Sequence, residues 1–230
     1  MHFHLPKPLH GWREFLGEVG IIVVGVLLAL GAEQVVETLH WRHQTAEERA
    51  VLDDEILSNL TAIQVRMVQE PCIRRRLDEI AVVLRRAKAH EPLGLIGEVG
   101  IPIPAGGSKG TWNIAVGGQA LAHMSQEEQD NYSGAFANFD NWDQLRADER
   151  SAWVGLAMLN GATDLSDPEY AAVRHSYEQA RAADLRIRNV GPFVLHIVKI
   201  EQPIPAPLPL ASVFSQAGYG AELCRSMTRG

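Results

Sequence analysis

The sequence predicts an all-α protein in which an N-terminal transmembrane helix is followed by a helical bundle of four to five helices. One long apolar run lies close to the N-terminus, and apolar residues recur every three or four positions through most of the remaining chain. We find no stretch of alternating apolar and polar residues of the kind that is typical of a strand. With 230 residues, the chain is long enough for one domain with a full hydrophobic core and a tail.

Composition and charge argue against several classes of protein. Charged residues make up 21% of the chain and apolar residues 46%, which disfavours both a disordered chain and one embedded throughout in a membrane. The formal net charge of -7 disfavours a nucleic-acid partner, because a negative surface repels phosphate. The densest basic stretch contains Arg74, Arg75, Arg76, Arg85, Arg86 and Lys88. Asp78 and Glu79 interrupt this stretch, and we interpret it as a solvated helix face.

The apolar run predicts a transmembrane anchor over residues 15–36. Its centre reads VGIIVVGVLLALGA, and the segment from Phe15 to Ala32 is about 27 Å long at the ~1.5 Å rise of a helix. That length approaches the ~30 Å hydrocarbon core of a bilayer. The run is apolar on every side, and Trp12 and Trp41 bracket it as interfacial aromatic residues do. A buried core helix and a cleaved signal peptide remain as alternatives.

The distribution of charge predicts the orientation of this anchor. Lys7 and Arg13 precede the apolar run, whereas Glu33 and Glu37 follow it. Because positive charge is retained on the cytoplasmic side, we expect residues 1–14 to form a cytoplasmic stub and the C-terminal domain to lie in the periplasm. The predicted location is therefore the inner membrane of a bacterium, crossed once.

Three positions within the anchor are candidate contact residues. Glu18 lies about one turn inside the cytoplasmic edge, where it reaches water or takes up a proton. An ionisable residue in a span is also a candidate for a proton or ion role, or for pairing with a neighbouring span. Gly25 and Ala29 are small residues one turn apart, a spacing that suits close contact between helices. We therefore predict Glu18, Gly25 and Ala29 as intramembrane polar and helix-contact residues, with self-association as one hypothesis.

Residues 37–200 are predicted to form a helical extracytoplasmic domain, followed by a proline-rich C-terminal tail over residues 201–230. The anchor helix is expected to continue to about residue 44, and a second amphipathic stretch covers residues 46–70. Its apolar face is formed by Leu52, Ile56, Leu60, Ile63 and Met67, whereas Asp53, Asp54, Glu55 and Asn59 lie mostly off that face. Pro71 lacks a backbone donor, so we expect a kink or a new helix there.

The second half of the chain contains further helices joined by loops. Residues 91–110 are rich in Gly and Pro and are expected to form a loop. The AGGSKGT segment that begins in this loop weakly resembles a phosphate-binding loop, but its Lys-Gly order and the lack of a clear preceding strand argue against nucleotide binding. Helices are predicted over residues 112–124, from the capping box at Ser125 to about Trp142, over residues 147–160, and from the capping box at Ser166 to Ile197, with Gly191-Pro192 as a candidate kink.

The chain contains two cysteines, Cys72 and Cys224, whose spacing is not that of a metal site. Two buried free thiols are expected in a cytosolic protein, whereas a disulfide is expected in an oxidising compartment. Since the anchor places both residues outside the cytoplasm, we predict a disulfide between them. On the chain-entropy model, a bond that closes so long a loop contributes roughly 4–5 kcal/mol.

The sequence contains no convincing catalytic constellation. His40 and His43 share a helix face near Glu37, but no HExxH motif and no third obvious ligand accompany them, so we interpret them as interfacial polar residues. No GxSxG motif is present, and neither cysteine has the surroundings of a nucleophile. We therefore expect no catalytic residue, no cofactor and no bound metal, and a protein that is not an enzyme.

Three segments carry a resemblance. They are FLGEVGIIVVGVLLAL at residues 15–30, QEPCIRRRL at residues 69–77 and the late pair Leu223-Cys224. Together they resemble a set of uncharacterised bacterial single-span membrane proteins, in which a Gly-Glu pair, an aliphatic run and Leu-Ala-Leu precede a long helix. The resemblance implies an N-terminal anchor and an all-helical extracytoplasmic domain, and it transfers no activity and no functional residue.

We expect the protein to act as a membrane-anchored helical interaction or sensing domain of the bacterial envelope. Its expected partners are the lipid bilayer and, beyond it, another envelope protein, a small ligand or a second copy bound through the anchor. One alternative is an accessory subunit of a larger membrane complex that makes contact through the three anchor residues. The other is a metal-assisted envelope enzyme that uses His40, His43 and Glu37.

Overall fold

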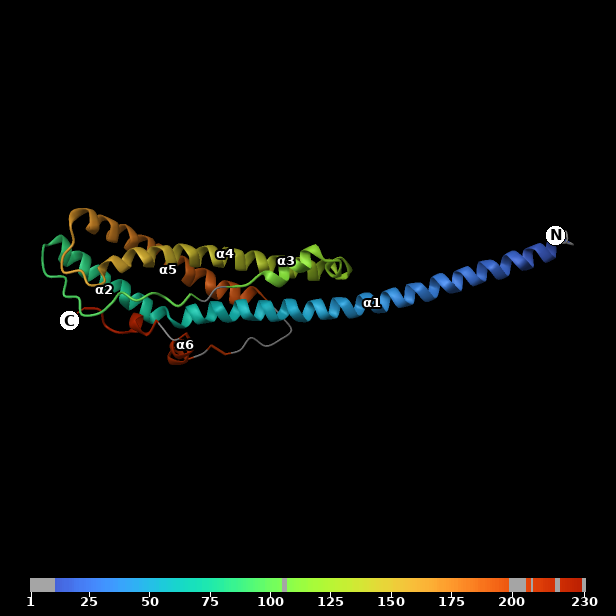
Figure 1. The fold of residues 1–230 in the computed structure, drawn as a ribbon, viewed down its shortest axis with the longest axis horizontal. Coiled ribbons are helices and arrows are strands. Elements are labelled where there is room, and N and C mark those ends of the chain that lie inside the picture. The colour runs from blue at the N-terminus through green and yellow to red at the C-terminus, as the bar shows by residue number, and fades with distance from the viewer. Residues whose placement is uncertain (1–10, 105–106, 199–205, 208, 218–219, 229–230) are drawn as a thin grey trace, which may run out of the picture.

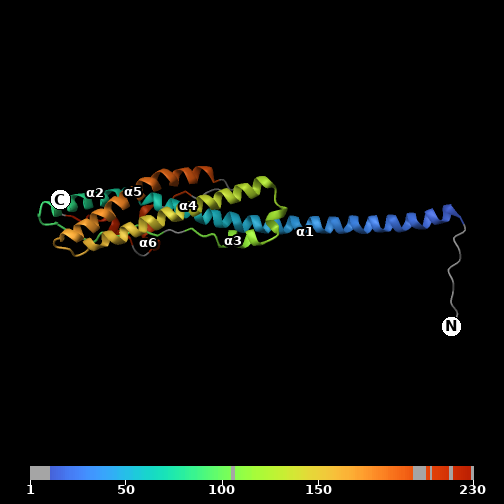
Figure 2. The ribbon, with the colours of Figure 1, turned by 90° about the horizontal axis from the view of Figure 1, so that it is seen from above.

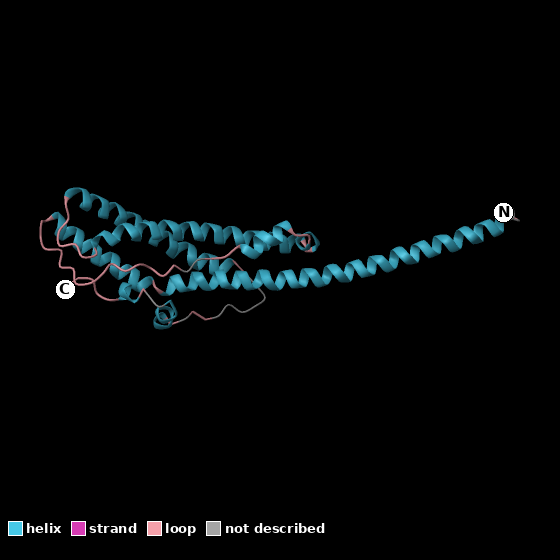
Figure 3. Ribbon diagram, in the orientation of Figure 1, coloured by secondary structure: helices cyan, strands magenta, loops and turns pink. Residues whose placement is uncertain are grey.

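The computed structural model describes residues 11–104, 107–198, 206–207, 209–217 and 220–228. Over these residues the chain forms six α-helices and three short 3-10 helices, with no strand, and the predicted all-α fold is confirmed (Figure 3). The α-helices are α1 (Trp12–Val68), α2 (Glu70–Lys88), α3 (Gly110–Gly117), α4 (Gln126–Leu156), α5 (Asp167–Ile197) and α6 (Leu210–Ala217). The 3-10 helices are η1 (Ala120–His123), η2 (Ala157–Leu159) and η3 (Ala221–Cys224). The predicted cytoplasmic stub up to residue 10, with Lys7, and most of the proline-rich stretch lie outside the described residues.

Helix α1 is a single helix of 57 residues, and its N-terminal half extends well beyond the rest of the molecule (Figures 1 and 2). It is the one helix, within the described part of the chain, that is long and apolar enough to cross a membrane. None of its apolar window is buried, so this segment is not a core helix of the domain. The C-terminal half has the opposite environment, because Leu52, Leu60 and Ile63 are fully buried. The amphipathic stretch over residues 46–70 therefore continues the anchor helix instead of forming a separate one.

The bundle first meets α1 near the expected membrane surface. The indole of Trp41 stacks on the imidazole of His123, with 3.8 Å between ring centroids and 15° between planes. This stack joins η1 to α1 at a point only about 8 Å along the helix from the end of the predicted anchor at Val36. Thr45, one turn further along, is the first buried residue of α1 among those described.

Two apolar cores lie at successive levels of the bundle. The proximal core joins α1, α3, α4 and α5, and its members include Leu52, Leu60, Ile63, Phe136, Phe139, Trp142, Ile187 and Val194. The distal core joins α2, α4, α5 and the C-terminal tail, and its members include Ile73, Ile80, Val83, Trp153, Leu156, Val173 and Leu223. Helices α4 and α5 run side by side through both levels (Figures 1 and 2). The tail contributes to the distal core through the fully buried Leu223 and Met227.

The observed helix boundaries correct several predicted ones. The expected helices over residues 125–142 and 147–160 are one helix, α4, because the residues between them include neither Gly nor Pro. The expected helix over residues 112–124 is instead α3 followed by η1, separated at Gly118-Gln119. Helix α2 begins beside Pro71, as expected.

Helix α5 continues through the candidate kink at Gly191-Pro192 to Ile197. Gly191 is buried here, and a Cβ atom at this position would lie 2.7 Å from the sulfur of Met67 and 3.3 Å from the indole of Trp142. The close approach of α5 to α1 and α4 therefore favours glycine at position 191, because a larger residue would displace the side chain of Met67.

Candidate functional site

A layer of charged side chains separates the two apolar cores. We call it the charge layer and define it by Arg66, Glu70, Arg146, Glu149, Asp184 and Arg188. These residues come from α1, α2, α4 and α5, so the layer contacts every long helix of the bundle. Its three guanidinium groups and three carboxyl groups balance one another in formal charge. A buried network of this kind is stable only when its members satisfy each other.

Arg66 lies at the centre of the charge layer and is 0% exposed. Its Nη2 atom donates to Oε1 of Glu149 at 2.7 Å and its Nε atom donates to Oε2 at 3.1 Å, in a bidentate arrangement. Nη2 also donates to Asp184 at 2.9 Å, and Nη1 donates to Glu70 at 3.3 Å. Because Arg66 belongs to the last turn of α1, these bonds join the end of the long helix to α2, α4 and α5.

The other two arginines complete the layer. Arg146 pairs with Glu149, and its Nη2 donates to the backbone carbonyl of Ile103 at 2.8 Å. Arg188 lies 3.2 Å from Asp184 and 3.3 Å from Glu70. Each carboxylate of the layer therefore contacts two guanidinium groups from different helices. One belongs to Arg66, and the other belongs to Arg146 or Arg188.

The crowded charges shift the titration of two members of the layer. Burial and the neighbouring Asp184 carboxylate raise the pKa of Glu70 to about 7, against the lowering effect of Arg66. Burial, together with the like charges of Arg66 and Arg150, lowers the pKa of Arg146 to about 9. Shifted pKa values within a buried group of charged side chains are a common mark of functional sites.

The charge layer is built from local pairs that sequence reasoning missed. Arg66 and Glu70 are four residues apart, Arg146 and Glu149 three, and Asp184 and Arg188 four, so each pair lies along one helix face. A signal was present in the periodicity. Positions 66, 149 and 184 all lie on apolar faces, one turn from Ile63, Ala152 and Ile187 respectively.

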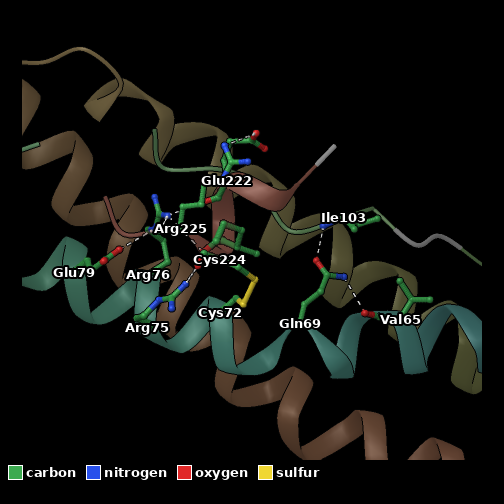
Figure 4. Close-up of a disulfide and its surroundings, with 11 residues drawn as sticks. Val65, Gln69, Cys72, Arg75, Arg76, Glu79, Ile103, Glu222, Cys224 and Arg225 are labelled. Atoms are coloured by element: carbon green, nitrogen blue, oxygen red, sulfur yellow. Dashed lines mark hydrogen bonds and ion pairs between the residues drawn. A yellow bond between two sulfur atoms is a disulfide. The ribbon is translucent and has the colours of Figure 1, made fainter. Parts of the chain in front are cut away.

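The junction between α1 and α2 is fastened to the following loop by Gln69, which is fully buried (Figure 4). Its Nε2 donates to the carbonyl of Val65 at 2.9 Å, and its Oε1 accepts the backbone N–H of Ile103 at 2.8 Å. Ile103 is thus held through its N–H by the junction and through its carbonyl by Arg146. These two hydrogen bonds hold the end of the loop over residues 91–104 against the charge layer.

One turn beyond the junction, a disulfide joins Cys72 to Cys224 across 152 residues, with 4.8 Å between Cα atoms. This is the predicted bond. Arg75 donates to the carbonyl of Cys224, so a second contact of α2 holds the same turn of the tail (Figure 4). Gly100 lies against this turn with φ +70, and a Cβ there would be 2.8 Å from the backbone nitrogen of Leu223. Position 100 therefore favours glycine on both conformational and steric grounds.

Arg76 holds the tail by a different means. It is 0% exposed, and its Nη2 donates to the carbonyls of Glu222 at 2.7 Å and Arg225 at 2.6 Å (Figure 4). Its Nη1 donates to the carbonyl of Glu98. The interpretation of the basic stretch as a solvated face is therefore wrong at this position, although Arg74, Arg75, Arg85 and Lys88 are exposed. We call the disulfide, Arg75 and Arg76 the tail clasp.

The glycine-rich loop that weakly resembles a phosphate-binding loop is occupied by side chains of α1. Glu55 accepts the hydroxyl of Ser108 at 2.8 Å and the backbone N–H groups of Thr111 and Trp112 at 3.2 and 2.9 Å. Asn59 exchanges two hydrogen bonds with the backbone of Ser108, at 2.7 and 2.9 Å. A carboxylate of the chain itself thus lies at the N-terminus of α3, where a phosphate would bind in a nucleotide site. Both residues are buried, so the expectation that they lie off the packed face of α1 is wrong.

The predicted anchor residues lie far from the charge layer. Glu18, Gly25 and Ala29 are exposed on the free half of α1, and a Cβ at Gly25 would meet nothing within 4 Å. Their roles stay predictions. His40 and His43 are also exposed, and the nearest carboxylate partner of His43 is Glu47, at 3.3 Å. Over the residues that the structure describes, no group of three or more potential metal ligands occurs.

Comparison with protein-family models, with curated proteins and with solved structures gave no match at the level of significance applied. The class of protein is therefore defined by the fold and the site alone. It is an all-α chain with one candidate membrane-spanning helix, an internal disulfide and a buried charge layer at the end of that helix.

Proposed function

We propose that the protein is a membrane-anchored sensing or interaction domain of the bacterial envelope. Residues 15–36 cross the inner membrane once, and the bundle with its tail lies in the periplasm. One observation carries this proposal: α1 continues without a break from an exposed apolar segment into the core of the bundle. An apolar helix with no packing partner in its own chain is stable in lipid, where it needs none.

Two features support the periplasmic side for the bundle. The disulfide between Cys72 and Cys224 is of the kind that persists in oxidising compartments. Arg13 precedes the apolar segment, whereas the first charged residues after it are Glu33 and Glu37, in keeping with a cytoplasmic N-terminus.

The charge layer supports a sensing role, because at the last turn of α1 it adds ion pairs with α2, α4 and α5 to the apolar contacts of the proximal core. A ligand or partner that changes the pairing of Arg146 or Glu149 also changes the partners of Arg66, which belongs to the last turn of α1. Such a network has a small number of discrete arrangements, and binding selects among them. The signal would pass along the single helix to the membrane.

The location is tested by labelling single introduced cysteines in intact spheroplasts with a maleimide that does not cross membranes. Gln144→Cys places a thiol on the exposed surface of α4, and Arg13→Cys places one before the apolar segment. We expect the first to react in intact spheroplasts and the second only after permeabilisation, while the wild-type chain, whose cysteines are bonded, stays unlabelled. Recovery of the intact chain in the soluble cytoplasmic fraction, or the reverse labelling pattern, would contradict the proposal.

The sensing or interaction role itself is tested by gentle solubilisation of native membranes, followed by affinity isolation of the full chain and mass spectrometry. We expect a stoichiometric envelope partner, or a small ligand that co-purifies, and its retention should fall in the charge-layer variant Glu149→Gln. The exposed-site variant Glu91→Gln serves as the matched control. Isolation of a solitary, ligand-free chain that shows enzymatic turnover would defeat this role.

A further inference from the structure

A groove lies between α2 and α5, at the end of the bundle farthest from the free half of α1 (Figures 1 and 2). Its two adjoining parts, of about 420 and 220 Å³, are both lined by Tyr177. The first part begins at the charge layer, because Asp184 and Arg188 line it, and the second reaches Lys88, the last residue of α2. From Arg74 to Lys88 the groove follows α2 for about 21 Å at ~1.5 Å per residue.

The groove carries an excess of positive charge. Three acidic side chains line it, those of Asp78, Glu178 and Asp184, against six basic ones. The basic side chains come equally from the two helices, and they are Arg74, Arg85 and Lys88 of α2 and Arg174, Arg181 and Arg188 of α5. Asp184 engages Arg188 at 3.2 Å, and Glu178 lies 3.9 Å from Arg181. The other four basic side chains are exposed and make no ion pair with a residue that the structure describes, so Asp78 is the one lining carboxylate that opposes them.

The spacing of the basic residues places them on one face of each helix. The three of α5 recur every seven positions, and those of α2 are separated by eleven and three positions. At about 100° per residue, each set lies within about 60° of the helix circumference. The two basic faces line the same groove. The positive charge is therefore concentrated there, although the whole chain has a formal net charge of -7.

Apolar side chains form the floor of the groove, between the basic rims. Leu77 and Leu84 of α2 and Tyr177 of α5 line it and are buried, and the exposed Leu185 lies beside them on α5. An apolar floor between basic rims is complementary to an amphipathic helix whose apolar stripe is flanked by carboxylates. The space beside two packed helices is also where a third helix docks, at axis separations of about 8–10 Å.

The height of the groove excludes two other anionic surfaces in the proposed arrangement. The groove begins at the level of Arg66, about 45 Å along α1 from Val36, so the headgroups of the membrane do not reach it. Acidic side chains do line a second cavity, of about 810 Å³, beside Arg49. Arg49 lies about 25 Å before Arg66 along α1, so the acidic cavity of a second copy in the same membrane stands at a different height. The partner that fits is therefore a different protein.

We propose that the groove between α2 and α5 binds an acidic amphipathic helix of another envelope protein, about four turns long. Its carboxylates contact the basic residues of α2 on one rim and Arg174 and Arg181 on the other, while its apolar stripe packs on the floor. At the inner end, a carboxylate of the partner competes with Asp184 for Arg188, and the change reaches Arg66 through Asp184. This inference deepens the proposed interaction role, and it rests on that role for the compartment in which the partner is found.

The test is photo-crosslinking of the full chain in intact cells, with p-benzoylphenylalanine in place of Leu185. We expect one dominant protein adduct, whose cross-linked peptide carries a net negative charge and an apolar residue at every third or fourth position. Combining Arg85→Glu with Arg174→Glu reverses one charge on each rim and should lower the yield by about tenfold or more. Arg85→Lys with Arg174→Lys keeps both charges and should retain the adduct.

Two matched controls separate the groove from general effects. Arg42→Glu with Arg225→Glu makes the same change in net charge at exposed sites outside the groove, and it should leave the yield unchanged. The photoreactive residue in place of Gln144, which is exposed on α4, should not give the adduct.

Three results would overturn the proposal. They are a yield at Leu185 no higher than at Gln144, an adduct with a neutral or basic peptide, a nucleic acid or a lipid, and an unchanged yield after charge reversal. Capture of an acidic helix from a cytoplasmic protein would support the groove and contradict the periplasmic location. Absence of the adduct together with the expected spheroplast labelling would defeat the groove alone, so the two failures are distinguishable.

Discussion

The regions around Arg66 and Arg76 show two ways to bury an arginine completely. Both side chains are 0% exposed, and they lie on either side of the break between α1 and α2. Arg66 is neutralised by carboxylates from three other helices. Arg76 instead donates mainly to backbone carbonyls of the tail and the loop, with one carboxylate, Glu79, at 3.1 Å.

The two arrangements differ in what remains when the arginine is removed. Without Arg66, Glu149 and Asp184 lose their central counter-charge while still excluded from water. Without Arg76, the groups left behind are mostly neutral carbonyls, and the disulfide between Cys72 and Cys224 still holds the tail in place. Equal burial therefore does not imply equal importance, and the charge of the partners decides the cost.

The largest effect is expected for Arg66→Met. Removing one member of a buried ion network costs about 3–5 kcal/mol, because the remaining carboxylates are left uncompensated. The measurement is thermal unfolding of the full chain in nanodiscs, monitored by circular dichroism. Arg74→Met, at an exposed position of α2, is the control and should change stability by less than about 0.5 kcal/mol. Similar losses in both variants would show that the charge layer adds nothing to stability.

The disulfide comes next. Cys72→Ser combined with Cys224→Ser should lower the free energy of unfolding by about 2–4 kcal/mol, because the unfolded chain gains freedom when a loop of 152 residues is opened. This loss is smaller than the roughly 4–5 kcal/mol of the chain-entropy model, because residual structure in the unfolded chain limits that freedom. Chemical reduction of the wild-type chain should produce the same loss. A double variant as stable as the oxidised wild type would contradict this expectation.

A smaller loss is expected for Arg76→Met while the disulfide is intact. The unsatisfied carbonyls of the tail should cost about 1–3 kcal/mol. In the background without the disulfide, the same substitution should free the tail, and limited proteolysis should then remove residues after α5. If proteolysis proceeds equally with and without the disulfide, the two parts of the tail clasp are independent.

The smallest of these effects is a dependence on pH. Since the pKa of Glu70 is raised from 4.5 to about 7, the folded protein holds this proton more tightly than the unfolded chain does. The stability that this group contributes is fully present below pH 4.5 and is lost as the pH rises to about 7. After allowance for partial exposure, the loss is on the order of 1–2 kcal/mol. Glu70→Gln should flatten this part of the stability profile, whereas Glu91→Gln, at an exposed site, should not.

A second carboxyl separates this effect from ordinary acid unfolding. Hydrogen bonds from Arg49 and Ser125 lower the pKa of Glu128 to about 2. The stability that Glu128 contributes is present above pH 4.5 and is lost as the pH falls to about 2, so its window does not overlap that of Glu70. A profile that changes only below pH 4.5 would show that Glu70 titrates normally.

The overall fold was predictable because its signals are local. Apolar periodicity, the capping boxes at Ser125 and Ser166, and the proline at position 71 predicted most of the helices. The disulfide was predicted from the expected oxidising compartment and from the presence of two cysteines in the chain. The split predicted between residues 142 and 147 was wrong, because the polar residues in between, Arg146 among them, are part of α4, and Arg146 pairs with Glu149 inside the bundle.

The charge layer was not predicted, because it depends on contacts between residues that are far apart in the sequence. A charged residue such as Arg66 or Asp184 on an apolar face is interpretable only when its partners on other helices are known. The same holds for Glu55 and Asn59, whose burial depends on a loop about 50 positions later in the chain. Arg76 lies on the apolar face of α2, between Ile73 and Ile80, which separates it from the exposed Arg74 and Arg75. What the local sequence does not show is that backbone carbonyls of the tail meet its guanidinium group.

Because α1 is unbroken, the number of its residues determines the height of the bundle above the membrane and its rotation about the helix axis. At ~1.5 Å and about 100° per residue, one amino acid inserted between Val36 and Thr45 would lift the bundle slightly and turn it by more than a quarter of a revolution about the helix axis. Four inserted residues would restore nearly the original facing at a greater height. The number of residues in α1 therefore sets the direction, relative to the membrane-spanning segment, in which the bundle and the tail clasp face.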